Sequence, residues 1–395
     1  MVYDSKNAPS RPQRRDTPSR AARMPSGASL KGEVVVKIVT DSVASIPAEV
    51  VRARDIEVVS LFVNRDGREY READMDVDAF YEDIADMIDN PPTSSQPSQH
   101  AMETIFEKAA QAADEVLGVF ISSKMSGAFE GAVRSARACK ERYKQFRCTL
   151  IDSTSNCGDE MFAVLDACDA RDAGGDLTRC AQAAIDSVVS SRFIFAPESL
   201  AFLKAGGRIG GASALLGGLL QISPVLTVAD WETATLAKVR TWKKTLARMV
   251  DIFKEDIDAC GLKRVVVHYI GSAAPAIKWA REAIEPVVGH AVEVLPVSPV
   301  IGVHVGPAVG IAYECERPVP GKLTAPTSEL VFSLGSYFHP ELHFRENRSS
   351  PAKSLLEFSA WREVRQKVRQ ISTVFKTGHL QEKNRRAPTN ADALR

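Results

Sequence analysis

Runs of β-branched and other apolar residues alternate with helical patterns in the first half of this chain, and this alternation constrains the fold most strongly. Four runs predict strands: Val34–Thr40, Ile56–Asn64, Glu115–Ser122 and Cys148–Ser153. Between and after them apolar residues recur at helical spacing, as at Phe129, Val133 and Ala136. Strands that alternate with helices favour βαβ units and a largely parallel sheet.

Hydroxyl and carboxyl side chains directly follow three of these predicted strands. They occupy residues 40–42 (TDS), 122–123 (SS) and 152–154 (DST). Open α/β sheets bind ligands beyond the carboxyl ends of their parallel strands. The pattern therefore predicts a ligand site at this edge of the sheet. Asp41 and Ser42 are also suited to cap the turn that follows the first strand.

A second α/β pattern begins near Ser191, so we place a domain boundary near residue 190. Its last part is read as a strand, a loop and a final strand over residues 291–315. The predicted organisation is a disordered basic tail (1–32), an N-terminal α/β domain (33–190), a C-terminal α/β domain (191–316) and a basic, partly helical extension (317–395).

Charge is unevenly distributed in a chain whose formal net charge is zero. Residues 1–30 hold six Lys or Arg against two Asp or Glu, and residues 316–395 hold fourteen against eight. The body between them carries thirty basic and forty acidic residues. A nucleic-acid partner requires clustered positive charge, so we expect none.

Two further patterns favour a cytoplasmic protein without a membrane span. The seven cysteines are odd in number and include no C-x-x-C motif, which indicates reduced thiols and no metal site. The uncharged run Gly210–Ala229 is long enough to span a membrane, but its four glycines and Pro224 favour a buried helix that runs into a buried strand. The N-terminus has no apolar signal core.

Ser126 lies where a predicted strand turns into a helix, in the stretch KMSGAFEGAVRSA. A serine there can cap the helix by accepting a backbone N–H, which is a structural role. The unpaired N–H groups and the helix dipole also suit an anion, to which Ser126 would donate a hydrogen bond. No G-x-S-x-G surrounds Ser126, so the nucleophile elbow of hydrolases is not indicated.

His304 and Arg208 are further candidate site residues. His304 precedes Gly306 and Pro307 in VHVGPAVG, and a single histidine after a strand is more often structural than functional. Arg208 lies in the glycine-rich stretch AGGRIGGAS. That stretch lacks the Lys-Ser/Thr of a phosphate-binding loop and does not indicate an ATP site.

Eight motifs, taken in order, resemble one family. They are KIVTDSVASIP, SSQPS, ISSKMSGAFEGA, IDSTSNCGDE, LAFLKAGGRIGG, LLQISPVL, KVRTWKK and HVGPAVG. This order is similar to that of the DegV family of fatty-acid-binding proteins, which includes the fatty-acid-binding B subunits of bacterial fatty acid kinase. The resemblance covers roughly residues 35–315. It implies two α/β domains, the first with a mainly parallel sheet flanked by helices and the second with a mixed sheet. A lipid tunnel and a carboxylate site at the interdomain cleft are also implied.

The resemblance implies that Ser94, Ser126 and His304 hold the carboxylate of a fatty acid. It also implies that Arg208 or Arg240 helps to bind the phosphorylated product or to dock the kinase. The secondary candidates are Thr93, Ser95, Gly127, Arg208 and Arg240. The chain departs from the family pattern at Ser94, Ala128, Ser223, Trp231 and Ala308.

The predicted function is that of a carrier without enzymatic activity, which needs no cofactor and no metal. It would present the carboxylate of a bound long-chain fatty acid to a partner kinase, which would make the acyl-phosphate for phospholipid synthesis. One alternative is an acyl-ester hydrolase with Ser126 as nucleophile and His304 as base. Another is a structural member of the family that binds no lipid.

The C-terminal extension contains a basic amphipathic pattern. Leu355, Phe358, Trp361 and Val368 recur at helical spacing, with Lys and Arg between them. Such a helix either contacts an anionic membrane or packs on the body with its basic face in solvent. We favour the packed helix.

Overall fold

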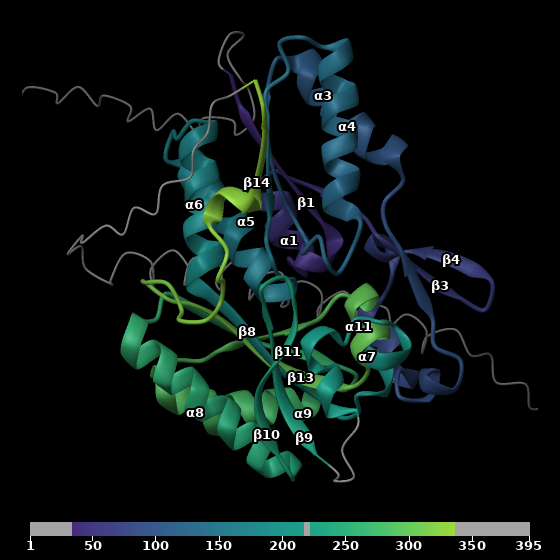
Figure 1. The fold of residues 1–395 in the computed structure, drawn as a ribbon, viewed down its shortest axis with the longest axis vertical. Coiled ribbons are helices and arrows are strands. Elements are labelled where there is room, and N and C mark those ends of the chain that lie inside the picture. The colour runs from purple at the N-terminus through teal and green to yellow at the C-terminus, as the bar shows by residue number, and fades with distance from the viewer. Residues whose placement is uncertain (1–33, 217–221, 336–395) are drawn as a thin grey trace, which may run out of the picture. The chain divides into compact units, whose positions relative to one another are not determined.

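The first sheet of the computed structural model, which describes residues 34–216 and 222–335, has five strands in the order β14-β7-β6-β1-β2 (Figure 1). The strands are β1 (Val36–Asp41), β2 (Ile56–Val59), β6 (Glu115–Phe120), β7 (Cys148–Asp152) and β14 (Val331–Leu334). The first four run parallel, and β14 pairs antiparallel with β7. The predicted, mainly parallel sheet is therefore confirmed.

Helices cover both faces of this sheet. They are α1 (Ala48–Ala53), α3 (Gln99–Ala112), α4 (Ala128–Arg142), α5 (Cys157–Asp172) and α6 (Leu177–Ser190). On one face, Phe106 of α3 shares an apolar cluster with Leu150. On the other, Ile185 of α6 shares a cluster with Leu117. Burial of both faces explains why these strands are almost continuous runs of apolar residues.

The second sheet has six strands in the order β10-β9-β8-β13-β11-β12. Its strands are β8 (Ser191–Pro197), β9 (Ser223–Ala229), β10 (Glu232–Val239), β11 (Arg264–Ile270), β12 (Glu293–Pro296) and β13 (Ala308–Glu314). Only β11 and β12 pair in parallel among these neighbours, so the predicted mixed sheet is confirmed.

Helices also cover the second sheet. They are α8 (Trp242–Cys260), α9 (Ala273–Trp279) and α10 (Glu285–Val288), with a π-helical turn at Ala280–Ile284. α8 and α9 pack on one face of the sheet, and α5 packs on the other. The predicted boundary near residue 190 falls between α6 and β8. The described residues from Val35 onward form one compact unit by their contacts, so the division into two domains stays a prediction.

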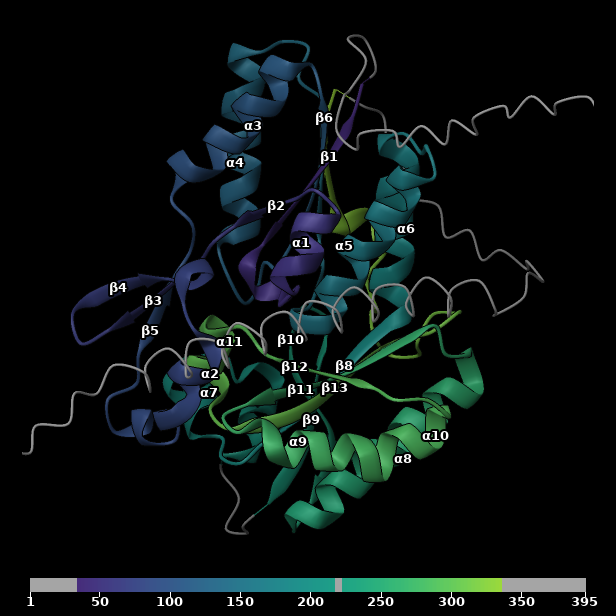
Figure 2. The same ribbon diagram turned by 180° about the vertical axis from the view of Figure 1, so that it is seen from behind.

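A three-stranded antiparallel sheet interrupts the first α/β pattern (Figure 2). It comprises β3 (Phe62–Arg65), β4 (Arg68–Arg71) and β5 (Thr93–Ser95). The prediction of one strand over residues 56–64 is therefore wrong. At the bend, Leu61 donates its N–H to Ser42 Oγ (2.9 Å), and its carbonyl accepts the N–H of Glu72 (3.0 Å). These contacts take the backbone of Leu61 out of the first sheet.

The helices near this small sheet differ from the sequence prediction. The stretch ETIFEKAAQAA predicts a helix from Glu103, but α3 begins at Gln99, because Ser98 Oγ caps it by accepting the N–H of Ala101 (3.2 Å). The hydroxyl-rich residues 93–95 therefore lie in β5 and not at the N-terminus of a helix. Phe80, Ile84 and Met87 recur at helical spacing and predict one helix over residues 76–89, but the structure divides this stretch into short pieces. These pieces are α2 (Val77–Phe80) and 3₁₀ turns at Tyr81–Asp83 and Asp86–Asp89.

Residues 317–335 return from the second sheet to the first. Lys322 forms a buried ion pair with Asp159 of α5, and β14 follows a 3₁₀ turn at Thr327–Leu330. The interpretation of this region as a basic extension missed the strand. The predicted amphipathic helix around residues 355–368 and the predicted tail over residues 1–32 lie outside the described residues.

The run Gly210–Ala229 forms a 3₁₀ turn at Gly210–Leu215 and then β9, with residues 217–221 outside the described part. Among the described helices, none is long and apolar enough to cross a membrane. All seven cysteines are buried free thiols, as the sequence predicted.

Candidate functional site

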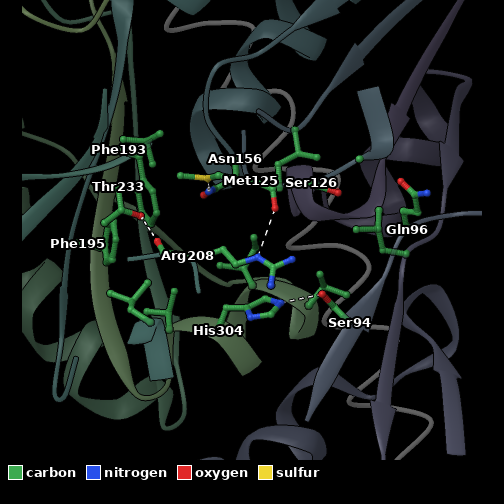
Figure 3. Close-up of a pocket in the computed structure, with 18 of the residues that line it drawn as sticks. Ser94, Gln96, Met125, Ser126, Asn156, Phe193, Phe195, Arg208, Thr233 and His304 are labelled. Carbon is green, nitrogen blue, oxygen red and sulfur yellow. Dashed lines mark hydrogen bonds between the residues drawn. The ribbon is translucent and has the colours of Figure 1, made fainter. Parts of the chain in front are cut away.

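β5 and α11 (Pro299–Val305) bring Ser94 and His304 together (Figure 3). Ser94 Oγ lies 2.7 Å from His304 Nε2. The sequence prediction placed His304 in a loop after a strand, but it occupies the last turn of a short helix. Pro299 begins this helix, and Gly306 follows it with a φ of 71°. Proline at the start and glycine after the end are ordinary helix signals, so this helix could have been predicted from the sequence.

His304 is a neutral imidazole near pH 7. Its side chain is 8% exposed, and burial together with the charge of Arg208 lowers its pKa to about 4. In the described part of the chain Nδ1 has no hydrogen-bond partner. A neutral ring donates through one nitrogen and accepts through the other. If Nε2 carries the proton and donates to Ser94 Oγ, the Ser94 hydroxyl is free to donate to a ligand.

A cavity of about 360 Å³ adjoins the Ser94–His304 pair. Its volume falls within the roughly 300–1,000 Å³ that is usual for small-molecule sites. Most of its wall is apolar: Leu61, Ile121, Phe193, Phe195, Leu203, Val228, Val300, Ile301 and Val305. Figure 3 shows Phe193 and Phe195 across the cavity from Ser94 and Gln96. The cavity therefore offers an apolar side and a polar side to one ligand.

Ser126 lines the same cavity and also contacts the first residue of α4, whose N-cap residue is Gly127. Ser126 Oγ accepts the N–H of Ala128, the first residue of the helix, at 3.3 Å. That contact uses a lone pair of the hydroxyl and leaves its hydrogen available to donate. This structural role and a ligand-binding role are therefore compatible in one side chain.

Gln96 and Asn156 line the cavity although the sequence analysis did not select them. Both lie inside quoted motifs, SSQPS and IDSTSNCGDE, and this was the available signal. A Cβ on Gly127 would lie 2.3 Å from Gln96 Oε1, so the glycine allows Gln96 to occupy this place. Asn156 Nδ2 contacts Met125 Sδ at 3.3 Å, and its buried Oδ1 has no partner among the described residues.

Arg208 also lines the cavity and is exposed. Its guanidinium donates to the carbonyls of Gly206 (2.6 Å) and Met125 (3.4 Å). Within residues 34–216 and 222–335 it forms no ion pair. The structure thus places an uncompensated positive charge beside the polar side of the cavity.

The remaining candidates are less well placed. Ser95 lines the cavity, but its Oγ donates to Glu69 (3.1 Å). Thr93 and Arg240 are exposed, and neither is among the described residues that line the cavity. Because side chains alternate along a strand, Thr93 and Ser94 project from opposite faces of β5.

The polar groups at the strand ends of the first sheet mainly form hydrogen bonds within the protein. The Asp41 carboxylate accepts the N–H groups of Val43 (3.0 Å) and Ile121 (2.9 Å), which confirms the predicted cap. Asp152 accepts the indole N–H of Trp231 at 2.8 Å. These side chains are occupied by internal contacts, and the cavity lies beside them.

The pairing that a hydrolase would need is not formed. His304 Nε2 contacts Ser94 and not Ser126, and in the described part of the chain no carboxylate accepts a hydrogen bond from His304. The described residues also contain no group of three or more His, Cys, Asp or Glu able to hold a metal ion.

Comparisons with known proteins identify the family. The model of the family described as "Uncharacterised protein, DegV family" matches residues 35–316. The chain belongs to the DegV family. A DegV domain-containing protein of Clostridium acetobutylicum is 39% identical to this DegV chain over 290 residues, which are 72% of this chain and 99% of the relative. A DegV domain-containing protein of Clostridium perfringens is 36% identical over 289 residues, which are 72% of this chain and all of the relative.

Solved DegV structures have the same fold. A fatty-acid-binding DegV family protein from Thermus thermophilus matches with a TM-score of 0.63 at 27% identity, over 71% of this chain and 100% of that one. DegV of Bacillus subtilis, described as a fatty acid binding protein, matches with a TM-score of 0.63 at 28% identity, over 72% of this chain and 100% of that one.

Proposed function

We propose that this DegV-family chain binds a long-chain fatty acid in the 360 Å³ cavity, with its carboxylate at Ser94, Ser126 and His304. The observation that carries the proposal is the Ser94–His304 pair, joined at 2.7 Å on the polar side of a largely apolar cavity. The DegV proteins of T. thermophilus and B. subtilis, which are described as fatty-acid-binding, support it.

The polar side of the cavity supplies what a carboxylate requires. Burial of a carboxylate without donors costs several kcal/mol, whereas a hydrogen bond to a charged group contributes about 1.5–3 kcal/mol. With the His304 proton on Nε2, Ser94 and Ser126 each retain a hydroxyl hydrogen that can point into the cavity. Arg208 adds a positive charge nearby, and a fatty-acid carboxylate would be its counter-ion.

The apolar side of the cavity supplies most of the affinity. Burial of one CH₂ group contributes about 0.8 kcal/mol, so a long acyl chain contributes on the order of 10 kcal/mol before ordering costs. The nine apolar side chains named above are all buried in the protein, and Met125, which also lines the cavity, is partly buried. The lipid tunnel itself is part of this proposal.

We extend the proposal to a partner kinase that phosphorylates the bound carboxylate. The exposed Arg208 supports this step, because a guanidinium binds phosphate oxygens through two parallel hydrogen bonds. Arg240, exposed at the end of β10, is proposed to contact the kinase. The chain itself would then carry the substrate and perform no chemistry.

Lipid analysis of the purified protein tests the binding proposal. Native mass spectra are expected to show one fatty acid per chain, either as purified or after addition of palmitate or oleate. Ser94→Ala should reduce loading, while Thr93→Ala is a matched control one residue away that should load like the wild type. Spectra that show only the bare chain after addition of fatty acid would refute the proposal.

A further inference from the structure

The segment from β3 to β5 (residues 62–95) carries Ser94 and also contacts the helix that carries His304. Within this segment Glu72 lies in the turn after β4 and is 6% exposed. One of its carboxylate oxygens accepts hydrogen bonds from Ser298 Oγ and from the N–H of Val300 (3.3 Å). A buried carboxylate from a distant part of the chain therefore lies at the N-terminus of α11.

Ser42 of the TDS motif links Glu72 to the end of β1. Its Oγ donates to the second carboxylate oxygen of Glu72 and accepts the N–H of Leu61 (2.9 Å). Both oxygens of Glu72 are thus occupied, one by the first sheet and one by α11. The contact also gives a role to a motif residue that does not line the cavity.

Tyr81 makes a second attachment between the same segment and α11. Its hydroxyl donates to the carbonyls of Val297 (2.8 Å) and Ser298 (3.0 Å). A Cβ on Gly302 would lie 2.5 Å from this hydroxyl, so the glycine allows the tyrosine to pack directly on the helix.

We infer that Glu72 is a positioning residue of the fatty-acid site, which sets α11 against β5 and thereby fixes His304 beside Ser94. α11 has seven residues, and no side chain of its own caps it. Pro299 has no N–H, so Val300 presents the first orphan donor of the helix, and Glu72 satisfies it. Burial raises the pKa of Glu72, whereas its hydrogen bonds from Ser298, Ser42 and Val300 favour the charged form, which complements the positive end of the helix dipole. That the ligand is a fatty acid rests on the proposed function, whereas the contact between Glu72 and α11 does not.

A double-mutant cycle on fatty-acid affinity tests the inference. Glu72→Ala is expected to weaken palmitate binding about tenfold, which is about 1.4 kcal/mol. In a His304→Ala background the same change should cost less than about twofold, because a residue that acts through His304 has nothing left to position. Glu72→Gln retains one oxygen for Ser298 and Val300 and should recover most of the affinity. An equal loss in both backgrounds, or no loss in the wild type, overturns the inference.

The imidazole resonances of His304 in the lipid-free protein give an independent readout. Glu72→Ala should shift them while those of the buried His268 stay in place. Glu314→Gln removes a buried carboxylate that binds Lys263 (2.9 Å) and should move neither. If Glu72→Ala does not fold, Ser298→Ala removes one donor to Glu72 and should shift His304 by less. Unchanged His304 resonances overturn the inference even if the wild type binds no fatty acid, whereas shifted resonances without lipid binding overturn only the proposed function.

Discussion

Replacement of His304 by Ala should separate ligand binding from the acid sensitivity of the fold. The variant loses the 2.7 Å contact to Ser94 Oγ, and with it the orientation of the Ser94 hydroxyl toward a carboxylate. Loss of one such hydrogen bond costs about 1–3 kcal/mol, so the Kd for palmitate should rise by about 5- to 150-fold. Direct titration with palmitate at pH 7.5 measures this change.

The same variant should be less destabilised by acid. The pKa of His304 is about 4 in the folded chain and about 6.5 in an unfolded one, because burial and the charge of Arg208 oppose protonation. The unfolded state therefore binds more protons between these values, and the stability that His304 provides is present above pH 6.5 and lost as the pH falls to 4. The difference corresponds to about 3 kcal/mol.

Denaturant unfolding of the lipid-free wild type and variant at pH 7 and pH 4.5 measures the contribution of His304 to the pH dependence of stability. The fall in the free energy of unfolding should be smaller for His304→Ala. Taking the difference between the two proteins cancels other groups, such as Asp41, whose pKa burial raises to about 7 and whose contribution has the opposite sign. His290→Ala replaces a half-buried histidine that does not line the cavity and should leave the affinity unchanged. Equal acid sensitivity of wild type and His304→Ala would show that the buried imidazole is not the neutral group described here.

Three further predictions concern Ser126 and the C-terminal region. Ser126→Ala should weaken palmitate binding by about 1–3 kcal/mol with a modest loss of stability, and a sharp fall in melting temperature with unchanged affinity would leave Ser126 a structural role alone. A serine-directed fluorophosphonate should not label the protein, and labelling at Ser126 would favour the hydrolase. Deletion of residues 350–395 should preserve palmitate loading. If that segment contacts anionic vesicles, the same deletion should abolish salt-sensitive co-sedimentation with them. Deletion of residues 317–395 should destabilise the fold, because it removes β14 and Lys322. Loss of loading in the shorter deletion, or a stable fold in the longer one, would contradict this division.

The regular elements could be predicted because their signals are local. β1, β6 and β7 are buried on both faces and appear in the sequence as almost continuous apolar runs. Helices such as α4 repeat small buried residues at helical spacing, as in Ala132, Ala136 and Cys139. Both kinds of pattern depend only on neighbours within a few positions, so they can be recognised without any knowledge of tertiary contacts.

The small sheet and the supports of the site depend on contacts between distant residues. Ile56–Asn64 is mostly apolar and has no turn signal, and the end of the strand at Val59 depends on the contacts of Leu61 with Ser42 and Glu72. Glu72 was overlooked because a single glutamate in a charged stretch resembles solvated surface. Its partners Ser298 and Val300 lie more than 220 positions away. Family resemblance identified Ser94 and His304 as site residues. It did not predict that His304 lies on a helix.

The late return of β14 has a consequence for synthesis on the ribosome. Thr149 of β7 and Ser333 of β14 contact each other across 184 positions. At about 5–20 residues per second, β14 is translated about 10–40 s after β7. During that interval β7 is the outer strand of a sheet whose other elements have already been made, and its free N–H and C=O groups can pair with another nascent chain. Crowded polysomes should therefore favour strand-swapped dimers of this protein, and a chaperone that covers β7 would suppress them.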